Sequence, residues 1–252
     1  MATVTPTPLL STRGLTRRFG GLTAVEDVDF DVAEGEVRAV IGPNGAGKTT
    51  LVSMICGRIA PTAGSIAFDG ADITQMPAHR RVLAGIAYTF QITSVFANLS
   101  AEENVALAVQ RRHTGGKGAR LRPAAMRAEV ADMLARVGLG ERAATPAGSL
   151  AYGHQRLLEI AMGLALKPRL LILDEPTQGL SDGEIADFLA LVRGIAHETT
   201  VLLIEHNMQV VMALADRITV MERGRIIAEG APDAIRADEG VQRAYLGAPA
   251  DG

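Results

Sequence analysis

The sequence feature that most constrains this chain is the glycine-rich stretch at residues 42–50, which reads GPNGAGKTT. The apolar run Val37–Ile41 precedes it, and a helical pattern starting at Leu51 follows it. A buried strand, a G-x-x-x-x-G-K-[ST] turn and a helix in this order predict a P-loop, in which backbone N–H groups surround a phosphate. We expect glycine at 42, 45 and 47 because a Cβ there would obstruct the approach to the phosphate. An ordinary glycine-rich turn between a strand and a helix is the alternative.

Two side chains of this turn carry chemistry. Lys48 is expected to reach the β- and γ-phosphates of a nucleotide, and the Thr49 hydroxyl to ligate Mg²⁺. The start of the following helix also favours an anion, because its N–H groups are unpaired and its dipole is positive there. A nucleoside triphosphate with Mg²⁺ is therefore the expected ligand. The residues expected to contact it are Asn44, Gly45, Ala46, Gly47, Lys48, Thr49 and Thr50.

A second anchor is the segment LLILDEP at residues 170–176. Four apolar residues predict a strand buried on both faces, and such strands deliver ligand-binding groups at their C-terminal ends. We expect Asp174 to hold Mg²⁺ through water, as a Walker B acid does, and Glu175 to polarise the attacking water. A strand end with an exposed acidic turn is the alternative.

Gln91 and His206 also follow predicted strands. Gln91 ends the strand at residues 86–91 and has an amide oxygen suited to a metal and the attacking water. His206 comes after the apolar run at residues 201–204 and Glu205, and could hydrogen-bond the γ-phosphate. Taken alone, each is better explained as a surface residue. Once the other motifs fix the order of the strands, both are better explained as residues of the site.

The composition excludes several classes of protein. The net charge of −3 and the 4% of aromatic residues, with no tryptophan, argue against nucleic-acid binding. The single cysteine, Cys56, permits no intrachain disulfide and is expected to be a buried thiol in a reducing compartment. We expect no signal peptide and no membrane span, so work at a membrane would require docking to another protein.

The pattern along the 252 residues predicts an α/β core with a helical insert at about 92–165. Strands are expected at residues 9–19, 22–32 and 36–41, with a helix at 49–58. From 100 to 137 the pattern is helical and opens with a Ser100–Glu103 capping box. The basic, glycine-containing stretch at 111–122 is expected to be a solvated loop, with contact to lipid headgroups or an acidic partner as the alternative.

The segment SLAYGHQR at residues 149–156 resembles the ABC-ATPase signature, usually written LSGGQ followed by QR. Together with Phe19, the P-loop, Gln91, Asp174-Glu175 and His206, it makes essentially the whole chain resemble the nucleotide-binding subunit of ABC transporters. The resemblance implies a P-loop ABC-ATPase core at 1–91 and 166–252, with an antiparallel β subdomain, and a helical signature subdomain at about 92–165.

The resemblance also implies roles for individual residues. Phe19 would stack on adenine with Val25 beside it, Gln91 would be the Q-loop residue, also on the metal, and His206 the switch histidine. The signature would contact ATP held by a second subunit through Leu150, Ala151, Tyr152, Gly153 and His154.

Two departures from the family pattern stand out. Ala151 replaces the signature serine, whose hydroxyl normally contacts the γ-phosphate held by the second subunit, and Tyr152 replaces the first glycine. We therefore expect this contact to come from the backbone at Gly153. The D-loop, usually SALD, reads QGLS at residues 178–181, with Asp182 one place beyond the usual acid.

Several stretches resemble the ATP-binding subunits of branched-chain amino acid importers. They are LAYG followed by QR and LEIA, TFQ followed by VF, and RAYLG near the C-terminus. Those of urea/amide uptake and lipopolysaccharide export are near relatives. The resemblance implies an Mg²⁺-dependent ATPase at the cytoplasmic face of a bacterial inner membrane. Its expected partners are a second ATPase subunit, usually a different chain, the membrane permeases and, indirectly, a periplasmic solute-binding protein.

A non-transport ABC ATPase of DNA repair or translation is the competing class. Repair members insert a long coiled coil before the signature, and residues 92–148 have no sustained heptads. Translation factors of this superfamily carry two cassettes in one chain, whereas this sequence has one.

Overall fold

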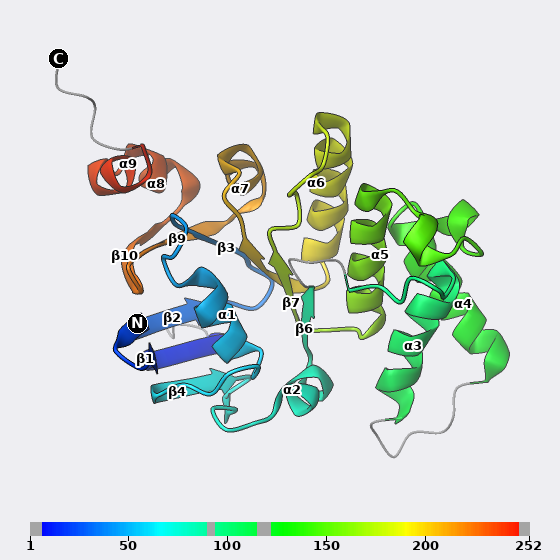
Figure 1. The fold of residues 1–252 in the computed structure, drawn as a ribbon, viewed down its shortest axis with the longest axis horizontal. Coiled ribbons are helices and arrows are strands. Elements are labelled where there is room, and N and C mark those ends of the chain that lie inside the picture. Colours follow the sequence, from blue (N-terminus) through cyan, green and yellow to red (C-terminus); the bar gives the residue numbers. More distant parts are fainter. Residues whose placement is uncertain (1–6, 90–93, 115–121, 247–252) are drawn as a thin grey trace, which may run out of the picture. The chain divides into compact units, whose positions relative to one another are not determined.

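The computed structural model describes residues 7–89, 94–114 and 122–246. The chain divides into two compact units, one formed by residues 1–81 and 196–252 and the other by residues 82–195 (Figure 1). The predicted helical insert, about 92–165, lies within the second unit, together with two strands and most of a further helix.

An antiparallel sheet in the order β2-β1-β4-β5 forms one part of the first unit. Its strands are β1 (Leu10–Phe19), β2 (Leu22–Val32), β4 (Ala63–Phe68) and β5 (Ala71–Asp72). The strands predicted at 9–19 and 22–32 are confirmed to within one residue. β5 was not predicted, because a two-residue strand after a turn has no periodic pattern to reveal it.

The apolar side chains of β2 alternate as predicted, apart from one irregularity. Val25, Val28, Phe30 and Val32 are all buried. Between Val25 and Val28, β2 contains one residue more than the facing stretch of β1, and Asp27 there has a φ of 51°. This bulge keeps both flanking valines on the buried face, which strict alternation would not allow.

The other strands of the first unit surround β3 (Val37–Ile41), which leads into the P-loop. β3 pairs in parallel with β8 (Thr200–Ile204) and β9 (Arg217–Glu222), and β10 (Arg225–Gly230) pairs antiparallel with β9. Every residue of β3 and β8 is buried, as expected for central strands of a parallel sheet. The helices of this unit are α1 (Lys48–Ile55), α7 (Met208–Leu214), α8 (Pro232–Ala237) and α9 (Glu239–Leu246).

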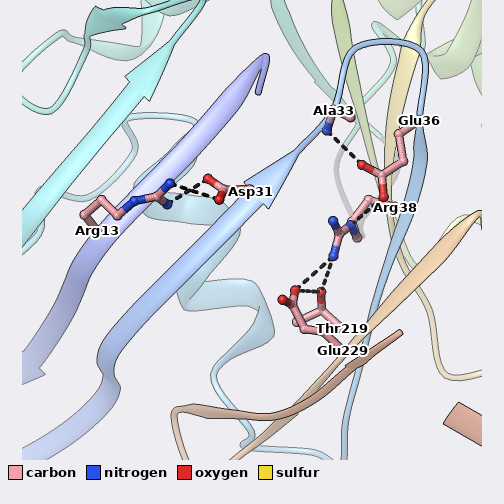
Figure 2. A network of polar contacts seen from close by, with 7 residues as sticks. All are labelled: Arg13, Asp31, Ala33, Glu36, Arg38, Thr219 and Glu229. Carbon is pink, nitrogen blue, oxygen red and sulfur yellow. Dashed lines mark hydrogen bonds and ion pairs between the residues drawn. The ribbon is translucent and has the colours of Figure 1, made fainter. Parts of the chain in front are cut away.

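A buried arginine ties β3 to its neighbours (Figure 2). Arg38 Nε donates to Glu36 Oε1 at 2.9 Å, and its Nη1 donates to Thr219 Oγ1 at 3.1 Å and Glu229 Oε1 at 2.9 Å. The second Glu36 oxygen accepts the N–H of Ala33 at 2.8 Å. These bonds link β3, the strand that leads into the P-loop, to β9 and β10.

The second unit combines a parallel strand pair with helices. Its strands are β6 (Ile86–Thr89) and β7 (Leu170–Asp174), paired with Tyr88 opposite Ile172. Its helices are α3 (Ala101–Thr114), α4 (Pro123–Arg136), α5 (Tyr152–Ala165) and α6 (Asp182–Ala196), with 3-10 turns at Gly140–Arg142 and Ala147–Ser149. α2 (Ala78–Ala84) lies at the boundary between the units. The Ser100–Glu103 capping box is confirmed, with both reciprocal bonds formed.

Residues 111–114, predicted as the start of a basic loop, instead continue α3. Arg112 explains the extension, because its guanidinium donates to Ala165 O at 2.8 Å and also pairs with Glu129. Residues 115–121 lie outside the described part of the chain, so the predicted loop there stays a prediction.

Three further observations concern Cys56, the end of α1 and the helices of the described ranges. Cys56 is buried, as predicted. The helix that was expected to run to residue 58 ends earlier, with Cys56 as its C-cap. Across the described ranges, none of the helices has the combination of length and apolar character that crossing a bilayer requires.

Candidate active site

The P-loop forms the turn between β3 and α1. Gly47 is the N-cap of α1, so the backbone N–H groups of the first helical turn face the loop. Lys48 Nζ donates to Gly42 O at 2.6 Å and to Pro43 O at 3.1 Å. The buried ammonium therefore lies inside the curve of the loop, where a phosphate group bound by the loop would meet a positive charge.

Two glycines of the P-loop are required by the chain itself. Gly42 and Gly47 have φ values of 153° and 100°, and a Cβ at either position would collide with a backbone carbonyl oxygen, that of Met221 or Ala24. Gly45 differs: its φ is 80°, and no atom of the described residues lies within 4 Å of where its Cβ would be. The sequence predicted glycines that make room for phosphate; packing against β2 and β9 is an additional reason at 42 and 47.

The turn between β9 and β10 forms a backbone hydrogen bond with the P-loop. The Gly224 N–H donates to Ala46 O at 2.9 Å, and Gly224 O accepts the N–H of Glu26 at 2.9 Å. Both Arg223 and Gly224 have positive φ, at 48° and 82°. The backbone of this turn therefore bridges the P-loop and β2, and it fixes Ala46 in place.

The residues predicted around the nucleotide differ in exposure. Asn44 and Thr49 are exposed and Thr50 is half-buried, whereas Ala46 is buried. Phe19, at the end of β1, is 44% exposed, and the guanidinium carbon of Arg17 lies 4.4 Å from its ring centroid. Val25 is fully buried and lies behind Gly47, so its expected place beside adenine stays a prediction.

His206 follows β8, and its side chain is 58% exposed. The residue before it, Glu205, is completely buried, and its Oε2 accepts the N–H groups of His206 at 2.8 Å and Asn207 at 3.0 Å. Asn207 in turn caps α7 with its side-chain oxygen. Glu205 therefore fixes the backbone on which His206 stands. The sequence reasoning missed it, although an acid directly after a buried strand was a visible signal.

In the second unit, Asp174 lies at the end of β7 and is 1% exposed. The hydroxyl of Tyr88, on β6, donates to Asp174 Oδ2 at 2.6 Å. Glu175 follows with a φ of 47°, and Gln178 N–H donates to its carbonyl at 3.2 Å. A positive φ in a residue other than glycine is uncommon and is often found at functional sites.

One residue of this region was missed in the sequence analysis, and another was predicted that cannot be compared. Tyr88 was not predicted, because nothing in the sequence places residue 88 next to residue 174 before the β6–β7 pairing is known. Gln91, predicted as the Q-loop residue, lies outside the described residues.

The signature segment begins α5. Ala151 is the N-cap of the helix, Leu150 is buried, and Tyr152 is 43% exposed. Gly153 is buried, and a Cβ there would collide with the carboxylate of Glu184 at the start of α6. His154 is half-buried. The roles of these residues toward a second subunit stay predictions.

The turn at residues 178–181 leads into α6 through a second capping box. Glu184 Oε2 accepts the N–H of Ser181 at 2.9 Å and its hydroxyl at 2.7 Å. These bonds stabilise the charged carboxylate and lower the pKa of Glu184 below its ordinary value. Gly179, within the turn, has a φ of 80°.

The donor groups suit a magnesium–nucleotide complex. Among the described residues there is no group of three or more His, Cys, Asp or Glu side chains arranged to hold a metal. Mg²⁺ at phosphate sites takes few protein ligands and completes its shell with phosphate oxygens and water. The Thr49 hydroxyl and the Asp174 carboxylate are hard oxygen donors of this kind, so they fit.

The P-loop after a buried parallel strand, the acid pair after another and the signature segment at the start of α5 together define an ABC-type ATP-binding subunit. Residues 25–178 match the family model described as ABC transporter. The chain belongs to this family, and the predicted membership and fold class are confirmed. A second model, described as branched-chain amino acid ATP-binding cassette transporter, matches residues 225–251.

Particular relatives extend over nearly the whole chain. The high-affinity branched-chain amino acid transport ATP-binding protein BraF of Pseudomonas aeruginosa is 43% identical, covering 95% of this chain and 98% of the relative. The corresponding protein LivG of Escherichia coli is 40% identical, with the same coverage.

Solved structures agree with this assignment. A nucleotide-free ATP-binding cassette from an ABC transporter matches with a TM-score of 0.85 and 27% identity, covering 95% of this chain and 99% of the other. The ADP conformation of an ATP-binding cassette matches with a TM-score of 0.84 and 27% identity, covering 96% and 99%.

Proposed function

We propose that this chain is the Mg²⁺-dependent ATPase subunit that powers bacterial uptake of branched-chain or related amino acids. The observation that carries the proposal is full-length similarity, at 43% and 40% identity, to two proteins named for branched-chain amino acid transport. The separate match of residues 225–251 supports the same solute class, since that model is described by it.

The P-loop binds the phosphates of ATP. Lys48 Nζ, which lies at Gly42 O and Pro43 O, exchanges these carbonyls for β- and γ-phosphate oxygens. The N–H groups at the start of α1 add hydrogen bonds to the same oxygens. Phe19 offers a ring at the end of β1 on which adenine stacks, and the stacking tolerates any purine.

Asp174 and Thr49 would hold Mg²⁺, which would supply positive charge to neutralise the phosphates of the nucleotide. Tyr88 restricts the carboxylate of Asp174 to one orientation through its 2.6 Å hydrogen bond. Such partners of a ligand residue commonly tune metal affinity. Gln91 completes the proposed set as a ligand to the metal.

Glu175 orients and polarises the water that attacks the γ-phosphate. His206 hydrogen-bonds the same phosphate, and the buried Glu205 keeps its backbone in place. Because phosphoryl transfer depends mainly on positioning and electrostatic stabilisation, fixing these groups on rigid strand ends is the main contribution of the protein.

The subunit acts in a pair, and residues 150–154 contact ATP held by the other member of the pair. The partner is a second ABC ATPase, most simply a different chain, as in the importer family. The helical segment at 92–165 docks on membrane permeases at the cytoplasmic face of the inner membrane, and a periplasmic binding protein delivers the solute.

The test is the Glu175→Gln variant, assembled with its partner ATPase and permeases. We expect ATP binding to persist and turnover to fall by a factor of about 10²–10⁴, the usual contribution of a positioned general base. Glu141→Gln is the matched control, since Glu141 is an exposed acid in the same unit and undergoes the same change of charge. Undiminished turnover of Glu175→Gln would remove Glu175 from the catalytic role.

The solute class is tested separately. Stimulation of ATP hydrolysis by the cognate binding protein is measured with leucine and with urea. Stimulation by leucine supports the proposal, and stimulation by urea alone would transfer the chain to amide uptake.

A further inference from the structure

Tyr152 and Gly179, two of the positions that depart from the usual signature and D-loop, contact each other. A Cβ at Gly179 would lie 3.1 Å from Cε1 and 3.5 Å from Cδ1 of the Tyr152 ring. Gly179 also has a φ of 80°, where a side chain is unfavourable. The ring of the tyrosine therefore packs on the bare backbone of the turn, in the space that a side chain at 179 would need.

The other end of Tyr152 joins a buried ionic chain. Arg156 Nη2 donates to the tyrosine hydroxyl at 2.9 Å, and the guanidinium carbon lies 5.3 Å from the ring centroid. Arg156 Nη1 pairs with Glu159 Oε2 at 3.0 Å, and both side chains are almost fully buried. The other oxygen of Glu159 accepts the N–H of Ser94.

These contacts form one continuous path within the second unit. It runs from the turn at 178–181, which begins three residues after Glu175, to Ser94, three residues after Gln91. Ordinary packing at the start of a helix would explain the contact of the ring with Gly179. It would not explain why a residue that is 43% exposed is also held through its hydroxyl by a buried arginine.

We propose that Tyr152 is a positioning residue that fixes the 178–181 turn and couples it, through Arg156 and Glu159, to the segment after Gln91. Its effect on turnover depends on the proposed ATPase function. In this arrangement the signature tyrosine also acts on its own subunit: it sets the conformation of the turn that follows Glu175, in addition to the proposed contact of residues 150–154 with the partner's nucleotide.

A double-mutant cycle tests the contact between Tyr152 and Gly179. Gly179→Ala adds a methyl group against the ring and also places alanine at a positive φ; in the Tyr152→Gly background the ring is gone and only the backbone penalty remains. We expect Gly179→Ala to lower kcat about tenfold in the wild-type background and about threefold or less in the Tyr152→Gly background. KM for ATP should change by less than about twofold, because the P-loop residues belong to the other unit.

Gly138→Ala is the matched control for the backbone penalty. Gly138 lies in the same unit with a φ of 72°, and no atom of the described residues lies within 4 Å of its would-be Cβ. Tyr152→Phe keeps the ring and removes the hydroxyl, so a lowered kcat at unchanged KM supports the path through Arg156. If Gly179→Ala lowers kcat equally in both backgrounds, the proposal is overturned. It is also overturned if the loss of activity equals the fraction of unfolded protein, so that kcat per folded molecule is unchanged.

A second readout needs no ATP hydrolysis. The chain has no tryptophan, so Tyr152→Trp introduces one fluorophore at the contact. We expect Gly179→Ala to shift its emission and Gly138→Ala to leave it unchanged; an emission that Gly179→Ala does not alter would refute the contact. If the wild-type complex hydrolyses no ATP, the proposed function fails, while this fluorescence result still decides the inference.

Discussion

Replacing Arg38 with methionine tests the ionic network of β3, the strand that leads into the P-loop (Figure 2). The arginine side chain is 4% exposed and bonds to Glu36, Glu229 and Thr219 across three strands. Methionine is apolar and, although shorter, of similar volume, so it fills much of the space but leaves Glu36, itself 8% exposed, without its cation. Removing one partner of a buried ion pair costs about 3–5 kcal/mol. Because Glu229 is 31% exposed and regains water, we expect about 3–4 kcal/mol.

Arg13→Met is the matched control. Arg13 makes two bonds to Asp31, at 2.7 and 2.9 Å, but the side chains are 52% and 48% exposed. An exposed pair of this kind contributes about 0–1 kcal/mol despite its good geometry. The two substitutions thus remove the same side chain from pairs that differ mainly in burial.

Urea unfolding of the purified subunit measures both variants. We expect the unfolding free energy of Arg38→Met to lie at least about 2 kcal/mol below that of Arg13→Met, with similar dependence on urea. Adding Glu36→Gln to Arg38→Met should recover part of the loss, because the uncompensated buried charge is then removed. Equal costs for the two arginines, or no recovery in the double variant, would refute the argument from burial.

Three further predictions follow from single contacts. Tyr88→Phe removes the hydrogen bond to Asp174, so the Mg²⁺ concentration for half-maximal ATP hydrolysis should rise about tenfold; a fall would mean that the hydroxyl competes with the metal. Ser181→Ala removes a hydroxyl that lowers the pKa of Glu184, so an NMR titration should move that pKa up toward 4.5. The stability from this bond is present above pH 4.5 and lost as the pH falls through the lowered pKa, so the variant should lose less stability on acidification than the wild type. Gly42→Ala forces a methyl group into a backbone carbonyl and should cost about 2–4 kcal/mol in urea unfolding.

Local rules made much of the fold predictable from the sequence. The apolar runs before the P-loop and before Asp174 became β3 and β7, because continuous apolar residues suit strands buried on both faces. The capping box at Ser100 formed as predicted, since its two bonds join residues only three positions apart. Each of these features depends on neighbours along the chain.

One expectation failed where a distant residue intervenes. The loop expected from residue 111 became helix because Arg112 bonds to Ala165, 53 residues away. Val25, expected beside adenine, is fully buried behind Gly47, and its contact with a nucleotide stays a prediction. A strand residue next to a site can face either way, and a bulge such as that at Asp27 decides which.

The sequence by itself determined the class of protein, because the P-loop, the acid pair and the signature are contiguous motifs whose chemistry depends on local backbone shape. Only the tertiary structure decided which side chains support them. Tyr88 reaches Asp174 across 86 residues, and Arg38 reaches Glu229 across 191. Such partners depend on strand register and on the path of the chain, and neither leaves a periodic pattern in the sequence. They matter because the free energy of a buried polar group depends on whether it has a partner.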